Sequence, residues 1–253
     1  MNDLFSLDNK NILITGASSG IGRQCAISCS DMGANVILLG RNPNRLEETF
    51  LSLKTGNHLT YTIDLKNTDA IDSAVSDAVV KIGKISGFIH SAGIETTLPL
   101  KNMKVGNYEE LFAVNVIAGF EIARILANKR NFSDAGASFV FISSVMSVVG
   151  EIGKIGYCSS KGALIAGAKS MALELATKKI RVNSISPAMV QTEMAEKLFE
   201  GITYESKLEI IKKHPLGIGE PIDIAAGCLF LLSEASKWIT GTNLIIDGGY
   251  SAK

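Results

Sequence analysis

Short apolar runs alternate with longer segments of helical periodicity along the chain. Residues 12–14 and 36–39 are apolar at every position, which is typical of strands covered on both faces. The segments between such runs repeat apolar residues every three or four positions, which predicts helices. Strands are expected at residues 12–15, 36–39, 61–63, 87–90, 138–143, 180–185 and 243–246, and helices at 21–32, 44–53, 68–82, 108–128, 157–177 and 222–232.

This alternation predicts the α/β fold class: a parallel, doubly wound sheet of Rossmann type with helices on both faces. No linker or low-complexity segment interrupts the pattern, so residues 1–253 are expected to form a single dinucleotide-binding and catalytic domain. Residues 188–215 are the least regular segment and follow a predicted strand. Because ligands of such folds bind at the carboxyl ends of strands, this segment is a candidate substrate lid. The alternative is an ordinary helical excursion on the surface.

The charge balance narrows the classes of partner. Lys and Arg number 25 and Asp and Glu number 25, so no domain-wide basic field is available to hold nucleic acid. The longest mostly apolar stretch, 224–232, is about half of the ~18 residues that a membrane span requires. Residues 1–10 lack the basic and apolar regions of a secretory signal. We expect a cytoplasmic protein that binds neither nucleic acid nor membrane.

Cysteine and histidine positions give little support to a metal site. The cysteines stand at 25, 29, 158 and 228, and only the first two are close in sequence. The histidines, at 58, 90 and 214, are scattered, so no ligand set of the usual spacing is present. Free, packed thiols and no metal are expected.

A glycine turn joins the first predicted strand to the first predicted helix. It reads Thr-Gly-Ala-Ser-Ser-Gly-Ile-Gly over residues 15–22. Glycines allow close approach of the backbone to a pyrophosphate, and the helix N-terminus offers unpaired N–H groups to its charge. The alternative is a purely structural turn. The cofactor contacts expected here are Gly16, Ser18, Ser19, Gly20, Ile21 and Gly22.

The end of the second strand distinguishes NAD(H) from NADP(H). An acidic residue here would bind the ribose 2′-hydroxyl, but the chain has Gly40 followed by Arg41. A forked cation without a competing carboxylate favours NADP(H) over NAD(H). Arg45, one helical turn on, either assists or is a solvated surface charge. Asp64, which precedes Leu65, is placed to accept from the adenine amino group or to cap the next loop.

Tyr157 is the only tyrosine in the chain that is followed by a lysine four residues on, Lys161. On a helix they share one face, so the ammonium is expected to stabilise the phenolate and lower the tyrosine pKa. Ser144 lies thirteen residues before Tyr157 at the end of a predicted strand, where a hydroxyl can donate to a substrate carbonyl oxygen. Ser143 is the competing assignment.

These residues together resemble the classical short-chain dehydrogenases/reductases over nearly the whole chain. The matching motifs are the glycine turn, the Tyr-x3-Lys pair, the serine thirteen residues earlier, and Asn115 between two valines. The resemblance implies that Tyr157 exchanges the proton and that Ser144 orients the carbonyl. It also implies that Lys161 holds the nicotinamide ribose and that Asn115 supports a water-linked proton relay.

Two motifs depart from the family pattern. His-Ser-Ala-Gly at 90–93 replaces Asn-Asn-Ala-Gly, which predicts altered bracing of the sheet with cofactor contacts retained at Ala92 and Gly93. His90 is interpreted as structural. Ala188 replaces the glycine of Pro-Gly-x3-Thr; the contacts implied around the nicotinamide are Pro187, Val190 and Thr192.

The leading functional hypothesis is an NADPH-dependent carbonyl reductase, or the reverse alcohol dehydrogenase, most similar to 3-oxoacyl-acyl-carrier-protein reductases. An acidic carrier protein would then be a partner, and a basic patch for it is expected at Lys129, Arg130, Lys178 and Lys179. The resemblance also implies a homo-oligomer, a tetramer or a dimer.

Other functions stay open. The ketone or alcohol could belong to a sugar, steroid, quinone or secondary metabolite. A non-catalytic NADP(H)-binding regulator is disfavoured because Ser144, Tyr157 and Lys161 are all present. An extended-type epimerase is disfavoured by the glycine spacing and the length. The apolar lid residues Met189, Met194, Phe199 and Tyr204 indicate a partly apolar substrate.

Overall fold

Seven parallel strands form one sheet, in the order β3-β2-β1-β4-β5-β6-β7. The computed structural model describes residues 4–252, so residues 1–3 and 253 of the predicted domain lie outside the described residues. All seven expected strands are present. They are β1 (Asn11–Thr15), β2 (Asn35–Gly40), β3 (Leu59–Thr62), β4 (Gly87–His90), β5 (Ala137–Ile142), β6 (Ile180–Pro187) and β7 (Asn243–Ile246).

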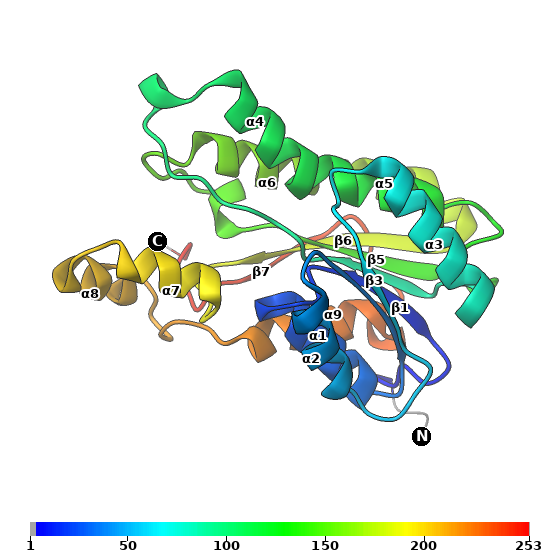
Figure 1. Cartoon of the computed structure of the whole chain (residues 1–253). Helices are drawn as coiled ribbons and strands as arrows, with labels where there is room; N and C mark the ends of the chain where they lie inside the picture. The colour runs from blue at the N-terminus through cyan, green and yellow to red at the C-terminus, as the bar shows by residue number, and fades with distance from the viewer. Residues whose placement is uncertain (1–3, 253) are drawn as a thin grey trace.

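Helices cover both faces of this sheet, which confirms the doubly wound prediction (Figure 1). Alternate strand residues face opposite sides: Leu13 and Ile37 belong to one core, and Ile12 and Val36 to the other. The first core lies under α3 (Thr68–Ile82), α5 (Ala118–Leu126) and α6 (Ile155–Leu175); the second lies under α1 (Gly20–Asp31), α2 (Pro43–Leu51) and α9 (Pro221–Leu232).

The strand order reverses between β1 and β4, and this reversal positions the site. β1 pairs with β2 on one side and with β4 on the other. Connections therefore leave the carboxyl ends of β1 and β4 toward opposite faces, which opens a crevice between them. The glycine turn and the segment after His90 both begin at this crevice.

The helix predicted at 108–128 contains a π-helical turn, Ala113–Ile117, between α4 (Val105–Phe112) and α5. One extra residue in this turn shifts the helical register at Asn115. Short 3₁₀ turns occur at Leu100–Asn102, Val145–Ser147, Ala176–Lys178 and Glu234–Ser236.

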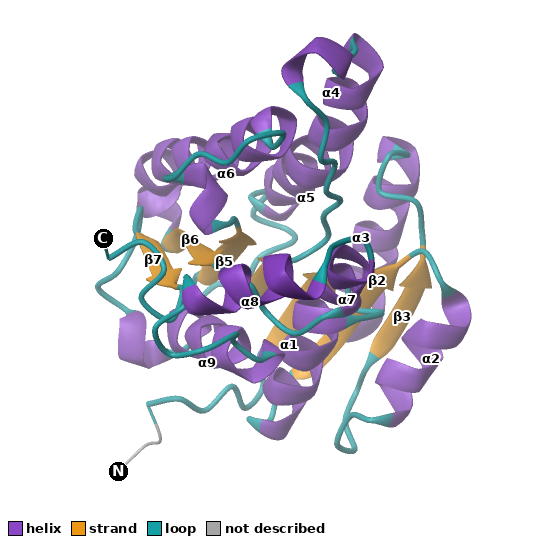
Figure 2. Ribbon diagram, turned by 90° about the vertical axis from the view of Figure 1, so that its left-hand side faces the viewer, coloured by secondary structure: helices purple, strands orange, loops and turns teal. Residues whose placement is uncertain are grey.

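The irregular segment 188–215 contains two helices, α7 (Glu193–Glu200) and α8 (Tyr204–Lys212). Thr192 and Thr203 cap them, each accepting a hydrogen bond from a backbone N–H three residues on. Figure 2 looks along the strands from the end where α7 and α8 stand in front of the sheet. The segment thus lies at the carboxyl ends of the strands, where a lid is expected.

Residues 4–252 include no helix both long and apolar enough to cross a bilayer. The four cysteines are free, as expected. The same residues contain no cluster of three or more metal-ligating side chains.

Candidate active site

The glycine turn fits against the segment that follows β4. Gly16 has φ +68°, and a Cβ there would lie 2.8 Å from the backbone N of Ala92. A Cβ on Gly22 would lie 2.3 Å from the carbonyl oxygen of Gly16. Only glycine fits at these positions, and the turn leaves the N-terminus of α1 open to a ligand.

A groove of about 1090 Å³ runs along this turn toward the lid. Its shape and its glycine cradle fit an extended dinucleotide. Of the expected cofactor residues, Gly22 lies beneath the turn, and Pro187 and Val190 line a neighbouring cavity with Tyr157 and Lys161. The groove is lined by the others: Gly16, Ser18, Ser19, Gly20, Ile21, Arg41, Asp64, Leu65, Ala92, Gly93 and Thr192.

Two arginines at the adenosine end of the groove differ in their partners. Both terminal nitrogens of the Arg45 guanidinium donate to the carboxylate of Glu193 at the start of α7, which ties α2 to the lid. The exposed guanidinium of Arg41 has no hydrogen bond or ion pair within residues 4–252. Of the two arginines, Arg41 is therefore the one available to a ligand. Asp64 accepts from the backbone N of Lys66 at 3.0 Å, so the loop-capping alternative describes its contact.

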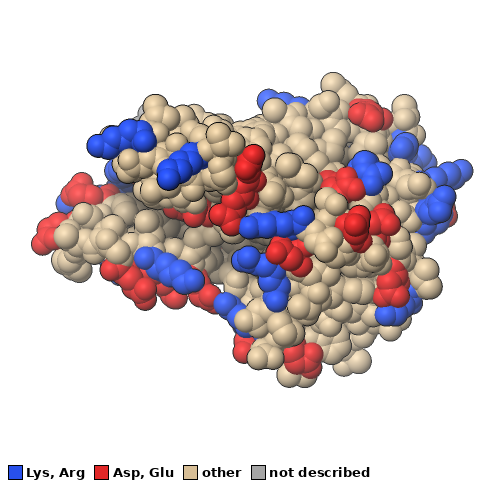
Figure 3. Space-filling model, turned by 45° about the horizontal axis from the view of Figure 1, so that its top comes forward, with Lys and Arg blue, Asp and Glu red and all other residues tan. Residues whose placement is uncertain are grey.

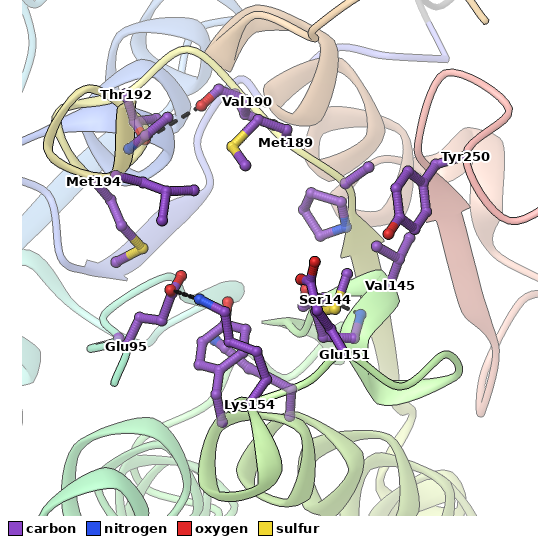
Figure 4. A pocket seen from close by; sticks show the side chains of 18 of the residues that line it. Glu95, Ser144, Val145, Glu151, Lys154, Met189, Val190, Thr192, Met194 and Tyr250 are labelled. Atoms are coloured by element: carbon purple, nitrogen blue, oxygen red, sulfur yellow. Dashed lines mark hydrogen bonds and ion pairs between the residues drawn. The ribbon is translucent and has the colours of Figure 1, made fainter. Parts of the chain in front are cut away.

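The neighbouring cavity, about 320 Å³, brings together the end of β5 and one face of α6 (Figure 4). The Ser144 and Tyr157 side chains both line it, and the Ser144 hydroxyl accepts from the backbone N of Met146 at 3.2 Å. The Lys161 Nζ lies 5.7 Å from the centre of the Tyr157 ring and donates to the Ile142 carbonyl at 2.8 Å. The three predicted catalytic side chains thus line one cavity. The Ser143 hydroxyl donates to the Lys161 carbonyl at 2.7 Å, so Ser144 is the better placed of the two serines.

The ionisation of Tyr157 differs from the expectation. Burial raises the pKa of Tyr157 to about 12, although the hydrogen bond with Ser144 acts to lower it. Burial also lowers the pKa of Lys161 to about 8. The lowering expected from Lys161 is wrong for the protein alone, where desolvation by burial is the largest influence on the Tyr157 pKa. The phenol therefore carries its proton at neutral pH, which is the state required of a proton donor.

Asn115 fastens the segment after β4 to α6. Its amide oxygen accepts from the backbone N of Ile94 at 2.8 Å. Its amide nitrogen donates to the Ile94 carbonyl and to the Ser160 hydroxyl, both at 3.0 Å. Both polar atoms of the side chain therefore take part in positioning. The π-helical turn leaves the Asn115 carbonyl able to accept from His90 Nε2 at 3.1 Å.

His90 is buried between β1 and this turn. Its Nε2 must carry the hydrogen, because its partner there, the Asn115 carbonyl, can only accept. Its Nδ1 therefore accepts from the Thr15 hydroxyl at 3.0 Å, and that oxygen in turn accepts from the backbone N of Ser91 and Ala92 at 3.2 Å. His90 thus takes over the bracing of the central strands, in agreement with its structural interpretation.

His90 should make the fold sensitive to acid. Burial chiefly, and the charge of Lys161, lower its pKa to about 3. Below pH ~6.5 the unfolded chain binds a proton that the folded chain excludes until pH ~3, so the free energy of unfolding falls as the pH falls through this range. At pH 5 the loss relative to pH 7 is about 2 kcal/mol. Urea unfolding of His90→Asn should show a smaller loss.

The matched control is His58→Asn, which removes a histidine outside the site. Because it retains His90, it should lose more stability between pH 7 and pH 5 than His90→Asn does. An unchanged pH dependence in His90→Asn would assign the effect to another group.

The lid supplies part of the cavity wall. Met189 and Met194 line the cavity, as expected. Phe199 and Tyr204 are not among its lining residues: the Lys207 Nζ lies 4.9 Å from the Phe199 ring centre, and Tyr204 is 71% exposed. Those two residues turn away because α7 and α8 each present only one face to the cavity.

Sequence reasoning missed the polar side of this cavity. Glu95 and Lys154 form an ion pair at its edge, and Glu151, His214 and Tyr250 also line it. Glu95 lies two residues after Gly93, and Lys154 lies three residues before Tyr157. The closeness of these two charged residues to the two motifs was the sequence feature that could have predicted the polar side of the cavity.

The predicted basic patch lies at the wrong end of the molecule. Lys129 and Arg130 precede β5, and Lys178 and Lys179 precede β6, so all four lie near the amino ends of strands. The cavities open at the carboxyl ends, where Figure 3 shows a hollow beside the end that carries α7 and α8. The topology thus separates this patch from the site mouth.

The glycine cradle and the Ser-Tyr-Lys cavity define a dinucleotide-binding oxidoreductase fold. A family model described as enoyl-(acyl carrier protein) reductase matches residues 16–251. The chain is 34% identical over 247 residues to the 3-oxoacyl-acyl-carrier-protein reductase of Rickettsia bellii, covering 97% of this chain and 98% of the relative. It is 31% identical over 250 residues to the NAD-dependent glycerol dehydrogenase of Listeria innocua, covering 98% and 96%.

A solved short-chain type dehydrogenase/reductase from Mycobacterium marinum superposes with a TM-score of 0.90 at 30% identity, covering 99% of each chain. The chain therefore belongs to the short-chain dehydrogenase/reductase family, whose members here are oxidoreductases that use a nicotinamide cofactor.

Proposed function

We propose that this protein is an NADP(H)-dependent oxidoreductase that interconverts a ketone and a secondary alcohol at Tyr157. The observation that carries the proposal is the meeting of Ser144, Tyr157 and Lys161 in one cavity beside the dinucleotide groove. A protonated phenol next to a second hydroxyl is the arrangement that carbonyl reduction requires.

The residues of the groove would hold the dinucleotide, whose nicotinamide supplies or accepts a hydride at the substrate carbon. In the reducing direction, Tyr157 Oη gives its proton to the carbonyl oxygen as negative charge develops there. The Ser144 hydroxyl donates to the same oxygen and orients it. The Lys161 ammonium favours the resulting phenolate, and Asn115 keeps α6 and the segment after β4 in register.

The cofactor preference rests on the adenosine end of the groove. Gly40 is buried and leaves no carboxylate there, and a Cβ on it would lie 3.1 Å from Leu46 Cδ2. The unpaired guanidinium of Arg41 stands beside it at the groove wall. A 2′-phosphate would find a cation there and no carboxylate at the end of β2, which supports NADP(H).

Two substrate classes have support. A 3-oxoacyl thioester is favoured by the reductase relative and by the methionines of the lid; an acyl carrier protein would then be a partner. A polyol or hydroxyketone is favoured by the ion pair in the cavity and by the glycerol dehydrogenase relative. A homo-oligomer and a cytoplasmic location, consistent with the free thiols, complete the proposal.

A substrate panel tests the activity. We expect NADPH oxidation with at least one of acetoacetyl thioester, hydroxyacetone, a diketone, a quinone and a steroid ketone, and slower oxidation of NADH under the same conditions. The absorbance of the reduced nicotinamide reports each rate. Tight NADPH binding without turnover of any ketone would contradict the catalytic proposal and favour a regulator.

A further inference from the structure

The ion pair between Glu95 and Lys154 lies in the wall of the catalytic cavity (Figure 4). Lys154 directly precedes α6 and is three residues before Tyr157, and both residues line this cavity. Glu95 comes from the segment after β4. Only 9% of the lysine side chain and 23% of the glutamate side chain are exposed. A largely buried pair thus faces the place where substrate binds.

Backbone contacts hold the two charges in place. The backbone N of Leu98 donates to the Gly153 carbonyl at 2.9 Å, which joins the two segments that carry the pair. Gly153 has φ +80°, and a Cβ on it would lie 3.1 Å from Thr97 Cγ2. The Lys154 carbonyl accepts from the backbone N of Cys158 at 2.7 Å, which anchors Lys154 to the first turn of α6. The pair is therefore preorganised.

The pair keeps hydrogen-bonding capacity that the chain does not use. Within residues 4–252, the Lys154 amine donates only to Glu95 Oε1, and Oε2 of Glu95 accepts no hydrogen bond. An ammonium has three donors, so two remain. Burial of such a pair brings little stability by itself, because desolvation offsets the attraction of the charges. A binding role accounts for its position better than a structural one.

We propose that Glu95 and Lys154 form a subsite for a hydroxyl group, so that the protein selects ketones and alcohols with a hydroxyl on the carbon next to the reacting carbon. The occupant must accept from the ammonium and donate to the carboxylate, and a hydroxyl does both. A carboxylate would be repelled by Glu95. An alkyl chain would displace water from the free donors of Lys154 and from Glu95 Oε2 without replacing its hydrogen bonds. The substrate class is therefore an α-hydroxy ketone or a vicinal diol. This inference rests on the proposed function.

The test compares two substrates of nearly equal size, hydroxyacetone and butanone, which differ by a hydroxyl in place of a methyl group. We expect kcat/KM of the native protein to favour hydroxyacetone at least about tenfold. In Lys154→Met that preference should fall at least about tenfold, with butanone reduced at nearly the native rate. In Glu95→Gln, which keeps an acceptor and removes the charge, the preference for hydroxyacetone should fall less.

The matched control is Lys84→Met, because Lys84 pairs with Asp134 and lines neither the cavity nor the groove. It should keep the native preference. If Lys154→Met unfolds, the exchange of the two charges, Glu95→Lys with Lys154→Glu, replaces it and should restore part of the preference. Equal kcat/KM for both ketones in the native protein, or an unchanged preference in Lys154→Met and the exchanged protein, would overturn the subsite.

A binding measurement separates this inference from the proposed function. Propane-1,2-diol should raise the Tm of the native protein more than butan-2-ol does, and Lys154→Met should lose the difference. If the native protein reduces no ketone but Lys154→Met still loses the difference in Tm, the catalytic proposal is contradicted and the subsite is retained. If the native protein reduces ketones but the diol does not raise its Tm, the catalytic proposal is retained and the subsite is contradicted.

Discussion

Tyr157→Phe should lower turnover at least about 100-fold and leave the affinity for NADPH unchanged. The substitution removes one oxygen at the centre of the cavity, and that oxygen is the proposed source of the proton. Ser144 remains to orient the carbonyl, and the groove that holds the cofactor is untouched. Steady-state rates give the loss of turnover, and fluorescence titration with NADPH gives the binding.

The control for this substitution is Tyr204→Phe, which removes the same oxygen from an exposed lid residue. It should have native rates. Retained activity in Tyr157→Phe would refute the acid role. Because the pKa of Tyr157 in the protein alone is about 12, ultraviolet titration should show no phenolate from this residue at pH 10. Binding of NADP⁺, which brings a positive ring into the cavity, should lower that pKa.

The central strands β1, β2, β4 and β5 could be predicted because they are short, mostly apolar and buried at nearly every position. All seven expected strands occur, each within a few residues of its predicted ends. The π-helical turn at Asn115 could not be predicted, since one inserted residue leaves the apolar pattern of the helix almost unchanged. The two lid helices were not assigned individually, because each is only eight or nine residues long and so spans little more than two turns.

The site shows the same division between local and distant signals. The glycine turn and Tyr157 with Lys161 are local patterns, and the structure brings them to adjoining cavities. Glu95 and Lys154 are 59 residues apart, so only the fold could show that they meet. The fold also corrects the predicted location of the basic patch. The loops that precede the strands lie at one end of a parallel sheet, and the loops that follow them lie at the other.

The pKa of Tyr157 was beyond sequence reasoning for a related reason. Spacing on a helix predicts which groups are neighbours, and Lys161 is indeed near the ring. It does not predict how much water is removed from around them. The burial that makes the cavity suitable for hydride chemistry also disfavours the phenolate until a further positive charge arrives.

Arg41→Ala should weaken NADPH binding about 10- to 100-fold while changing NADH binding little. A charge-assisted contact to a phosphate is lost in the first case, and no phosphate is present at that position in the second. Fluorescence titration with each cofactor measures both affinities. The control is Arg23→Ala, since Arg23 pairs with Glu48 and is not a lining residue of the groove.

The same experiment distinguishes the two arginines at the groove. Arg45 is already neutralised by Glu193, so Arg45→Ala should affect NADPH less than Arg41→Ala does. An equal loss for NADPH and NADH in Arg41→Ala would show that the 2′-phosphate is held elsewhere. A larger loss in Arg45→Ala would mean that the phosphate displaces Glu193 from its partner, and cofactor binding would then release α7 from α2.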